Sequence, residues 1–279
     1  MEALLVQANA LLAEPKALLA LPAVQFGAAP FAAGLAAALL LQPLRLAGLA
    51  VAAGFFATLY LAGRLDFQER LLIAVAAAAA FGALTDAAFR PTRAAGVLLG
   101  LAFGMAAFWV YFRLLGGKPP LELALYAVGI TALTALAVAC SVLSLDEPAR
   151  AGAAGIGLGA ALVAGGWMFA SRYDPAAFAL AAASGGFLLL AMVYGKGLSP
   201  GASFTLSSGV TASLLAAGAV LTGRLPWQAA AALVLVPIAV RLPVPQRGLL
   251  AAQALVALLY ALAAAGGVGA IAWYVRRGG

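Results

Sequence analysis

"LELALYAVGITALTALAVACSVLS" (residues 121–144) carries a single charged residue, Glu122, close to its beginning. A helix needs about 20 mostly apolar residues to cross ~30 Å of bilayer hydrocarbon, and this stretch supplies them without a break. Its apolar residues do not alternate with polar ones, as they do in the strands of a membrane barrel. The stretch therefore predicts a transmembrane helix.

Similar apolar runs recur along all 279 residues, and short segments rich in proline, glycine or charge separate them. The sequence is 66% hydrophobic and 9% charged, whereas a soluble domain has roughly 25% charged residues. We expect an all-α polytopic transmembrane bundle of about ten spanning helices, because helices bond their own backbone groups within lipid. The runs lie near residues 17–41, 46–63, 71–88, 94–115, 121–144, 151–170, 176–194, 203–222, 228–240 and 248–275.

The domain organisation follows from the ends of the chain and from the short separators. Residues 1–15 place apolar residues at helical spacing and end at Pro15, which predicts an interfacial amphipathic helix lying along the membrane. The separators leave no room for an extramembrane domain, so residues 16–279 are expected to form one domain. Ten helices also allow two inverted halves, 17–144 and 151–275. The run 228–240 is short and contains Pro237, so it could be broken.

Charge and residue usage limit the chemistry. The formal net charge is +7, but the basic residues stand singly at the ends of apolar runs, which is typical of membrane anchors and not of a nucleic-acid surface. The sequence has no histidine and one cysteine, Cys140, so it predicts no cofactor and no internal disulfide. We expect a multi-pass protein of a bacterial-type inner membrane that contacts lipids. The sequence also allows a homo-oligomer or a membrane complex with a partner protein.

Among the apolar runs, the one with the most hydroxyl residues is 203–222, which begins within "YGKGLSPGASFTLSSGV" (194–210). Ser203, Ser207 and Thr211 are spaced four apart and share one helix face. Such hydroxyls either bond to the carbonyl four residues earlier or to a neighbouring helix, or they line a polar pathway with a lysine at its mouth. The second interpretation predicts pathway residues Tyr194, Lys196, Ser203, Ser207, Ser208, Thr211 and Gln253.

These features favour a small permease for an uncharged or amphipathic solute rather than an enzyme. Nearly every charged residue falls in or beside a separator, so no acidic relay is expected at mid-membrane, where ionisable groups are expensive and functional. The helix count and the lack of extramembrane domains resemble ten-helix drug/metabolite-type transporters.

A second interpretation starts from "GRLDFQER" (63–70), where Asp66 and Glu69 would share a helix face and Arg70 would pair with Asp66. Asp174 follows the sixth run. This placement resembles the UbiA-type intramembrane prenyltransferases, which carry NDxxD-like motifs after their second and sixth helices. The resemblance implies a prenyl or lipid transferase in which Asp66, Glu69 and Asp174 hold Mg²⁺ and a diphosphate, although Leu65 stands in place of the motif's asparagine. A third interpretation is a non-catalytic subunit of a larger membrane complex.

Overall fold

The structure is a computed structural model that describes residues 19, 21–63, 69–88, 92–166, 174–244 and 249–278. Within these residues the regular secondary structure is helical and contains no strand, which confirms the all-α class. The predicted interfacial helix over residues 1–15 lies outside the described residues.

Helices occupy every predicted run. A π-helical turn, η1 (Val24–Ala28), leads into the first helix, and short 3₁₀ helices border several others: η2 (Gln42–Leu44), η3 (Ala47–Leu49), η4 (Val142–Ser144) and η5 (Gly195–Gly197). The α-helices are α3 (Ala29–Leu41), α4 (Ala50–Leu61), α5 (Glu69–Ala88), α6 (Arg93–Leu115), α7 (Pro120–Ser141), α8 (Pro148–Gly166), α9 (Asp174–Tyr194), α10 (Gly201–Leu221), α11 (Trp227–Ala232), α12 (Leu235–Ala239) and α13 (Leu250–Gly278).

Eight helices in the described residues are long and apolar enough to span a bilayer, which is fewer than the ten or so predicted. The two shorter apolar segments are 47–61 and 227–239. Large apolar side chains cover the outside of the bundle, as a lipid-facing surface requires; they include Leu40, Leu98, Leu121, Val128 and Leu249. The chain is a multi-pass integral membrane protein.

The run predicted over residues 228–240 is broken, as its proline suggested. It forms α11 and the five-residue α12, which are separated by Leu233 and Val234. Around these two residues the backbone N–H groups donate to the carbonyl three residues earlier, as in a 3₁₀ helix; Val236 N, for example, donates to Leu233 O at 3.1 Å. Pro237 has no N–H to donate to the Leu233 carbonyl, so the helical bond that would join α12 to the end of α11 at this carbonyl is missing. Beyond α12, the Arg241 guanidinium donates to the Leu143 carbonyl at 2.9 Å and ties the segment to the end of α7.

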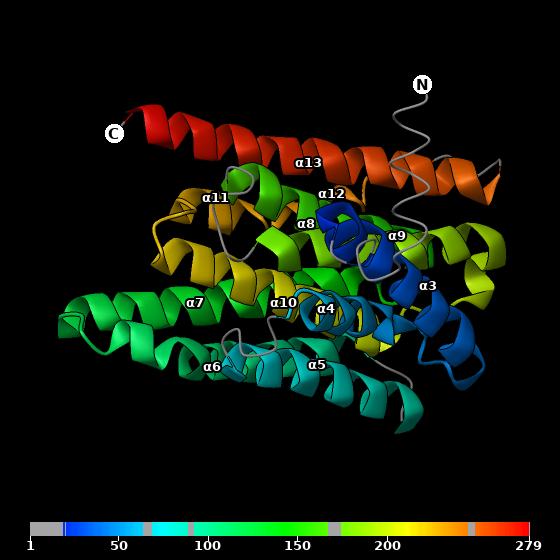
Figure 1. Ribbon diagram of the computed structural model, residues 1–279, viewed down its shortest axis with the longest axis horizontal. Coiled ribbons are helices and arrows are strands. Elements are labelled where there is room, and N and C mark those ends of the chain that lie inside the picture. Colours follow the sequence, from blue (N-terminus) through cyan, green and yellow to red (C-terminus); the bar gives the residue numbers. More distant parts are fainter. Residues whose placement is uncertain are drawn as a thin grey trace.

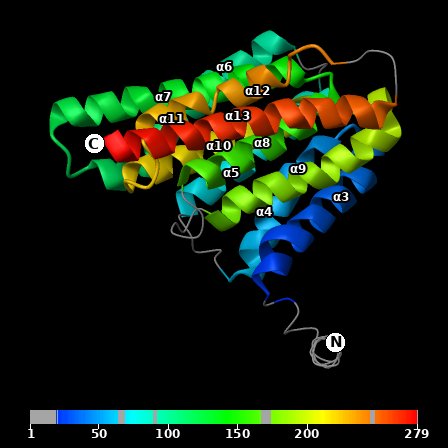
Figure 2. The ribbon, with the colours of Figure 1, turned by 90° about the horizontal axis from the view of Figure 1, so that it is seen from above.

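The centre of the bundle is α10. It packs against α5, α7, α8 and α9, and nearly all of its residues are buried. In Figure 1 α13 runs along the top edge of the molecule and α5 and α6 along the bottom, with α10 between them. Figure 2 shows α10 again among the other helices from a perpendicular direction. The helix with the most hydroxyls is therefore the one furthest from lipid.

Glycines allow other elements to approach the start of α10 closely. A Cβ added at Gly82 of α5 would lie 2.6 Å from Ser203 Cα, and one at Gly48 of η3 would lie 2.2 Å from the Pro200 carbonyl oxygen. Helices in lipid associate through such close backbone packing, because lipid tails remove most of the hydrophobic gain between them.

Helices from the two predicted halves interleave. From the first half, α3 and α4 pack against α9 of the second half, and α5 and α7 pack against α10. The core is therefore shared by both halves. The division into 17–144 and 151–275 stays a prediction.

Candidate functional site

The hydroxyls of α10 lie inside the bundle. Ser203, Ser207, Ser208 and Thr211 are each at most 2% exposed. Two of them bond within their own helix: the Ser207 hydroxyl donates to the Ser203 carbonyl at 2.5 Å, and the Ser208 hydroxyl donates to the Phe204 carbonyl at 2.8 Å. The predicted bond to the carbonyl four residues earlier is confirmed for these two side chains. Such a bond satisfies a hydroxyl donor without a neighbouring helix.

Four buried hydroxyls have no hydrogen-bond partner among the described residues: Thr134 on α7, Ser144 in η4, Ser184 on α9 and Thr211 on α10. Each is at most 1% exposed. Leaving a buried polar group unsatisfied costs about 1–3 kcal/mol. Because α7 and α9 both pack on α10, three of these hydroxyls belong to the central helix or to helices directly against it.

Ser184 shows how closely this region is packed. A Cβ added at Gly155 of α8 would come within 2.2 Å of Ser184 Oγ and within 3.3 Å of the Phe204 ring. The Phe204 ring itself packs against Phe187, with ring centroids 4.5 Å apart. The unpaired Ser184 hydroxyl therefore lies where α8, α9 and α10 meet.

Asp86 is a buried residue that was not predicted to belong to the site. Its carboxylate lies near the end of α5 and is 9% exposed. Oδ1 accepts the Ala202 N–H at 2.6 Å, and Oδ2 accepts the Ser203 N–H at 2.8 Å. The first N–H groups of a helix have no partner within the helix, and the positive end of the helix dipole attracts an anion. Asp86 thus caps α10 from another helix.

Gly201 makes room for this contact. Its φ is +64°, and a Cβ there would lie 2.3 Å from Asp86 Oδ2. The name Asp86 clamp is used below for Asp86, Gly201, Ala202 and Ser203. Two features of the sequence accompany the clamp: a carboxylate late in an apolar run, and a Pro-Gly pair directly before the hydroxyl-rich run.

The other predicted pathway residues belong to other elements than α10. Tyr194 ends α9 and is exposed, whereas Gln253 is half-buried near the beginning of α13. Lys196 belongs to η5, and its side chain is not among the described residues. The pathway of these seven residues stays a prediction.

The residues of the transferase interpretation are only partly described. Glu69 is the first residue of α5 and is exposed, Asp66 lies outside the described residues, and Asp174 begins α9 with its side chain outside them. Among the residues that the structure describes, no group of three or more metal-ligating side chains comes together. Arg70 stacks on the Trp109 ring at 5.0 Å and donates to the Trp109 carbonyl at 3.0 Å. The transferase interpretation stays a prediction.

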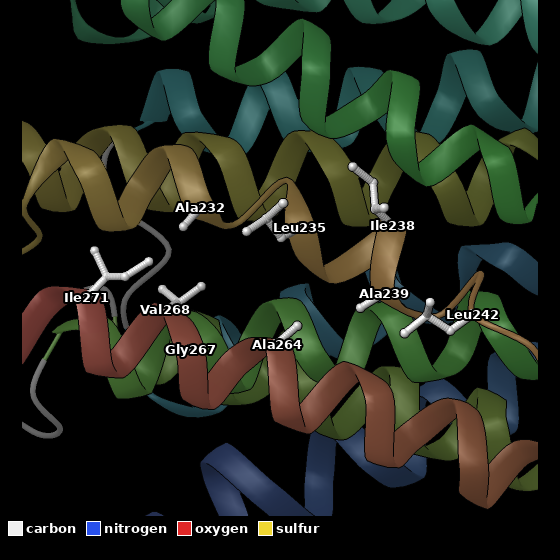
Figure 3. Close-up of a pocket in the computed structure, with 9 residues that line it drawn as sticks. All are labelled: Ala232, Leu235, Ile238, Ala239, Leu242, Ala264, Gly267, Val268 and Ile271. Carbon is white, nitrogen blue, oxygen red and sulfur yellow. The ribbon is translucent and has the colours of Figure 1, made fainter.

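An apolar groove of about 310 Å³ lies between the α11–α12 segment and α13. Figure 3 shows side chains of both segments facing the groove. All nine residues that line it are apolar, so it suits hydrocarbon and not a charged group. They are Ala232, Leu235, Ile238, Ala239, Leu242, Ala264, Gly267, Val268 and Ile271.

Comparisons with protein-family models, with curated proteins and with solved structures each found no match. The fold and composition establish a polytopic integral membrane protein. Any more specific function has to be inferred from its own residues and their geometry.

Proposed function

We propose that this chain is a small permease for an uncharged or amphipathic solute in a bacterial-type inner membrane, with α10 lining the pathway. The observation that carries the proposal is the set of unpaired buried hydroxyls around α10, namely Thr134, Ser184 and Thr211. They lie on α10 and on two helices, α7 and α9, that each pack against it. A solute that passes along α10 would offer each of them a partner.

The energetic argument concerns two states of the bundle. In the packed state each unpaired hydroxyl costs about 1–3 kcal/mol, which is unfavourable unless another state gives it a partner. A solute oxygen or amide in an opened pathway would supply that partner. Binding would then shift the population toward the open state, because the solute interacts better with that state than with the packed one.

The charge distribution supports a neutral solute. Among the described residues, Asp86 is the one buried charged side chain, and backbone N–H groups of α10 already bind both of its oxygens. An anion would find no buried positive side chain among the described residues, and a cation would have to compete with these N–H groups for the Asp86 oxygens, so little offsets the cost of leaving water. A hydroxyl-bearing or amide-bearing solute would find partners.

The groove beside α13 supports an amphipathic solute. All of its lining side chains are apolar, and no atom lies within 4 Å of a Cβ added at Gly267. The groove suits the hydrocarbon part of a molecule that arrives from the bilayer. The hydroxyls near α10 would take the polar part.

The experiment is flux into proteoliposomes that contain the full-length chain. Stopped-flow light scattering would follow entry of glycerol and urea, and a dansyl-labelled fatty amine would report an amphipathic solute. We expect faster entry of at least one probe than into empty liposomes. Thr211→Val should slow that entry by about tenfold, equivalent to one lost hydrogen bond of about 1.4 kcal/mol.

The matched control is Thr85→Val, since Thr85 on α5 is half-buried and donates to the Phe81 carbonyl of its own helix at 2.7 Å. This variant should transport like the unaltered protein. Entry at the rate of empty liposomes for every probe contradicts the permease. Equal effects of Thr211→Val and Thr85→Val contradict the pathway along α10.

A further inference from the structure

We propose that the groove between the α11–α12 segment and α13 is a binding site for an anionic phospholipid. One acyl chain lies in the groove, and the phosphate binds at the arginine cluster, which consists of Arg224, Arg276 and Arg277. The inference does not rest on the proposed permease. An amphipathic solute that enters the same groove would replace the lipid chain.

The groove is open to the outside of the bundle. Three of its large lining side chains, Leu235, Ile238 and Leu242, are between 44% and 54% exposed. In a multi-pass membrane protein this outer surface is in contact with lipid tails. The groove has a volume of about 310 Å³, which is at the lower end of the range of about 300–1,000 Å³ for ligand sites. It therefore suits part of one hydrocarbon chain and not a whole lipid.

One end of the groove leads to the arginine cluster. Ala232 of α11 and Ile271 of α13 mark this end in Figure 3. Arg276 follows Ile271 by five residues, which is about 7.5 Å along the helix axis. On the other wall, Arg224 lies three residues before α11, and its backbone carbonyl accepts a hydrogen bond from the Arg276 guanidinium. Both walls of the groove therefore lead to the same basic residues.

Two polar residues lie between the groove and the arginine cluster. Gln228 comes four residues before Ala232 in α11, and Tyr274 comes three residues after Ile271 in α13. At this spacing each continues the helix face that lines the groove. An amide and a phenol hydroxyl can both donate hydrogen bonds to ester or phosphate oxygens. Along the groove the surface thus changes from apolar to polar to basic, which is the order of the chain, the ester linkage and the phosphate in a phospholipid.

The charge of the arginine cluster is complementary to a phosphate. Arg224 and Arg277 are exposed, and neither forms an ion pair with a described residue. The Arg277 guanidinium lies over the Trp273 ring at 4.0 Å from its centroid. Arginine can stack on an aromatic ring and still bind phosphate through two N–H groups. An anion bound here would offset the repulsion between these neighbouring positive charges.

The end of the bundle that carries the cluster also favours an anionic lipid. In Figures 1 and 2 the connection between α6 and α7 lies at the same end as the C-terminus. Arg113 in the last turn of α6 and Lys118 in the connection add basic residues there. Basic residues collect on the cytoplasmic side of membrane proteins, and the cytoplasmic leaflet is the one with a negative surface potential. A zwitterionic lipid would instead bring a positive group close to the arginines.

Native mass spectrometry of the full-length chain in detergent micelles tests the site. We would titrate the protein with phosphatidylglycerol and, separately, with phosphatidylcholine of the same acyl chains, and measure the Kd of the first bound lipid. Phosphatidylglycerol should bind about tenfold more tightly than phosphatidylcholine. Arg224→Gln and Arg277→Gln should each weaken binding of phosphatidylglycerol by about fivefold and leave binding of phosphatidylcholine unchanged.

The chain offers matched controls for the charge and for the groove. Arg113→Gln removes an exposed arginine at the same end of the bundle, away from the groove, and should bind like the unaltered protein. A Cβ added at Gly266 or Gly267 of α13 meets no atom within 4 Å, and Gly267 lines the groove whereas Gly266 does not. Gly267→Leu should therefore weaken binding of both lipids by about fivefold, because chain methylenes lose their contact with the groove. Gly266→Leu should leave both affinities unchanged.

Equal affinity of the unaltered protein for the two lipids overturns the proposal. An effect of Arg113→Gln as large as those of Arg224→Gln and Arg277→Gln also overturns it, because surface charge alone would then attract the lipid. If Gly267→Leu does not fold, competition with glycerol 3-phosphate takes its place: a headgroup without a chain should not displace phosphatidylglycerol, and displacement contradicts the groove as the chain site. A preference for phosphatidylglycerol without solute flux keeps the lipid site and removes the permease, and flux without the preference does the reverse.

Discussion

Gly201→Ala tests the geometry of the Asp86 clamp most directly. Gly201 has a φ of +64°, and a methyl group there would lie 2.3 Å from Asp86 Oδ2 and 2.6 Å from Asp86 Cγ. Both separations are far below van der Waals contact. The substitution therefore strains the backbone and also drives the carboxylate away from the N–H groups of Ala202 and Ser203.

The two costs have separate magnitudes. A non-glycine residue in the left-handed region costs about 1–2 kcal/mol. Loss of one hydrogen bond to a charged group costs about 1.5–3 kcal/mol, and the displaced carboxylate must lose at least one. Gly201→Ala should therefore lower the free energy of unfolding by about 2.5–5 kcal/mol.

Gly223→Ala isolates the backbone cost. Gly223 follows α10 with a φ of +70°, and an added Cβ would meet no atom within 4 Å. This variant should lose about 1–2 kcal/mol only. In an Asp86→Ala background the carboxylate is gone, so Gly201→Ala should then cost about as much as Gly223→Ala; the difference between backgrounds is the coupling energy of the clamp.

Reversible unfolding by SDS in mixed micelles, followed by circular dichroism, gives these free energies on the full-length chain. In the otherwise unaltered protein, Gly201→Ala should lower the free energy of unfolding clearly more than Gly223→Ala does. Equal losses for the two variants, within about 0.5 kcal/mol, would refute the contact between Gly201 and the Asp86 carboxylate.

Two further predictions use the same unfolding assay. Tyr111→Phe removes the hydroxyl that donates to the Leu214 carbonyl of α10, so it should cost about 0.5–1.5 kcal/mol, and an unchanged free energy of unfolding would count against that bond. Gly48→Ala places a methyl group 2.2 Å from the Pro200 carbonyl and should destabilise by about 1–3 kcal/mol. The control is Gly129→Ala, in α7 with open space around it, which should raise the free energy of unfolding by about 0.5–1 kcal/mol. If Gly48→Ala and Gly129→Ala change the free energy of unfolding in the same direction, the close approach of η3 to α10 is contradicted.

The sequence was sufficient to predict the class and most helix positions. The run predicted over 121–144 became α7 and η4, which together end at Ser144, because proline and charged residues on both sides cannot continue a helix through hydrocarbon. The number of spanning helices was less predictable. Residues 47–61 are apolar enough to join a membrane bundle, but they form a helix too short to span it.

Which helix would become central could not be predicted from composition. Most runs consist of the same alanine, leucine and valine, and packing in lipid is decided by which small residues face each other after folding. The bonds of Ser207 and Ser208 were predictable because a hydroxyl and the carbonyl four residues earlier are neighbours on any helix. The partner of Asp86 was not, because 116 residues separate it from Ala202.

Two hydrogen-bonded contacts restrain α10, and they differ in kind. At its beginning the Asp86 carboxylate binds Ala202 and Ser203, whereas further along the Tyr111 hydroxyl binds the Leu214 carbonyl. Loss of the first contact with retention of the second, as in Asp86→Ala, would let α10 tilt about the region of Leu214 and not translate along its axis. Such a tilt displaces residues in proportion to their distance from Leu214. It would therefore move Ser203 and Ser207 further than Thr211, so a pathway along α10 opened by this tilt should widen first at the end of α10 that Asp86 holds.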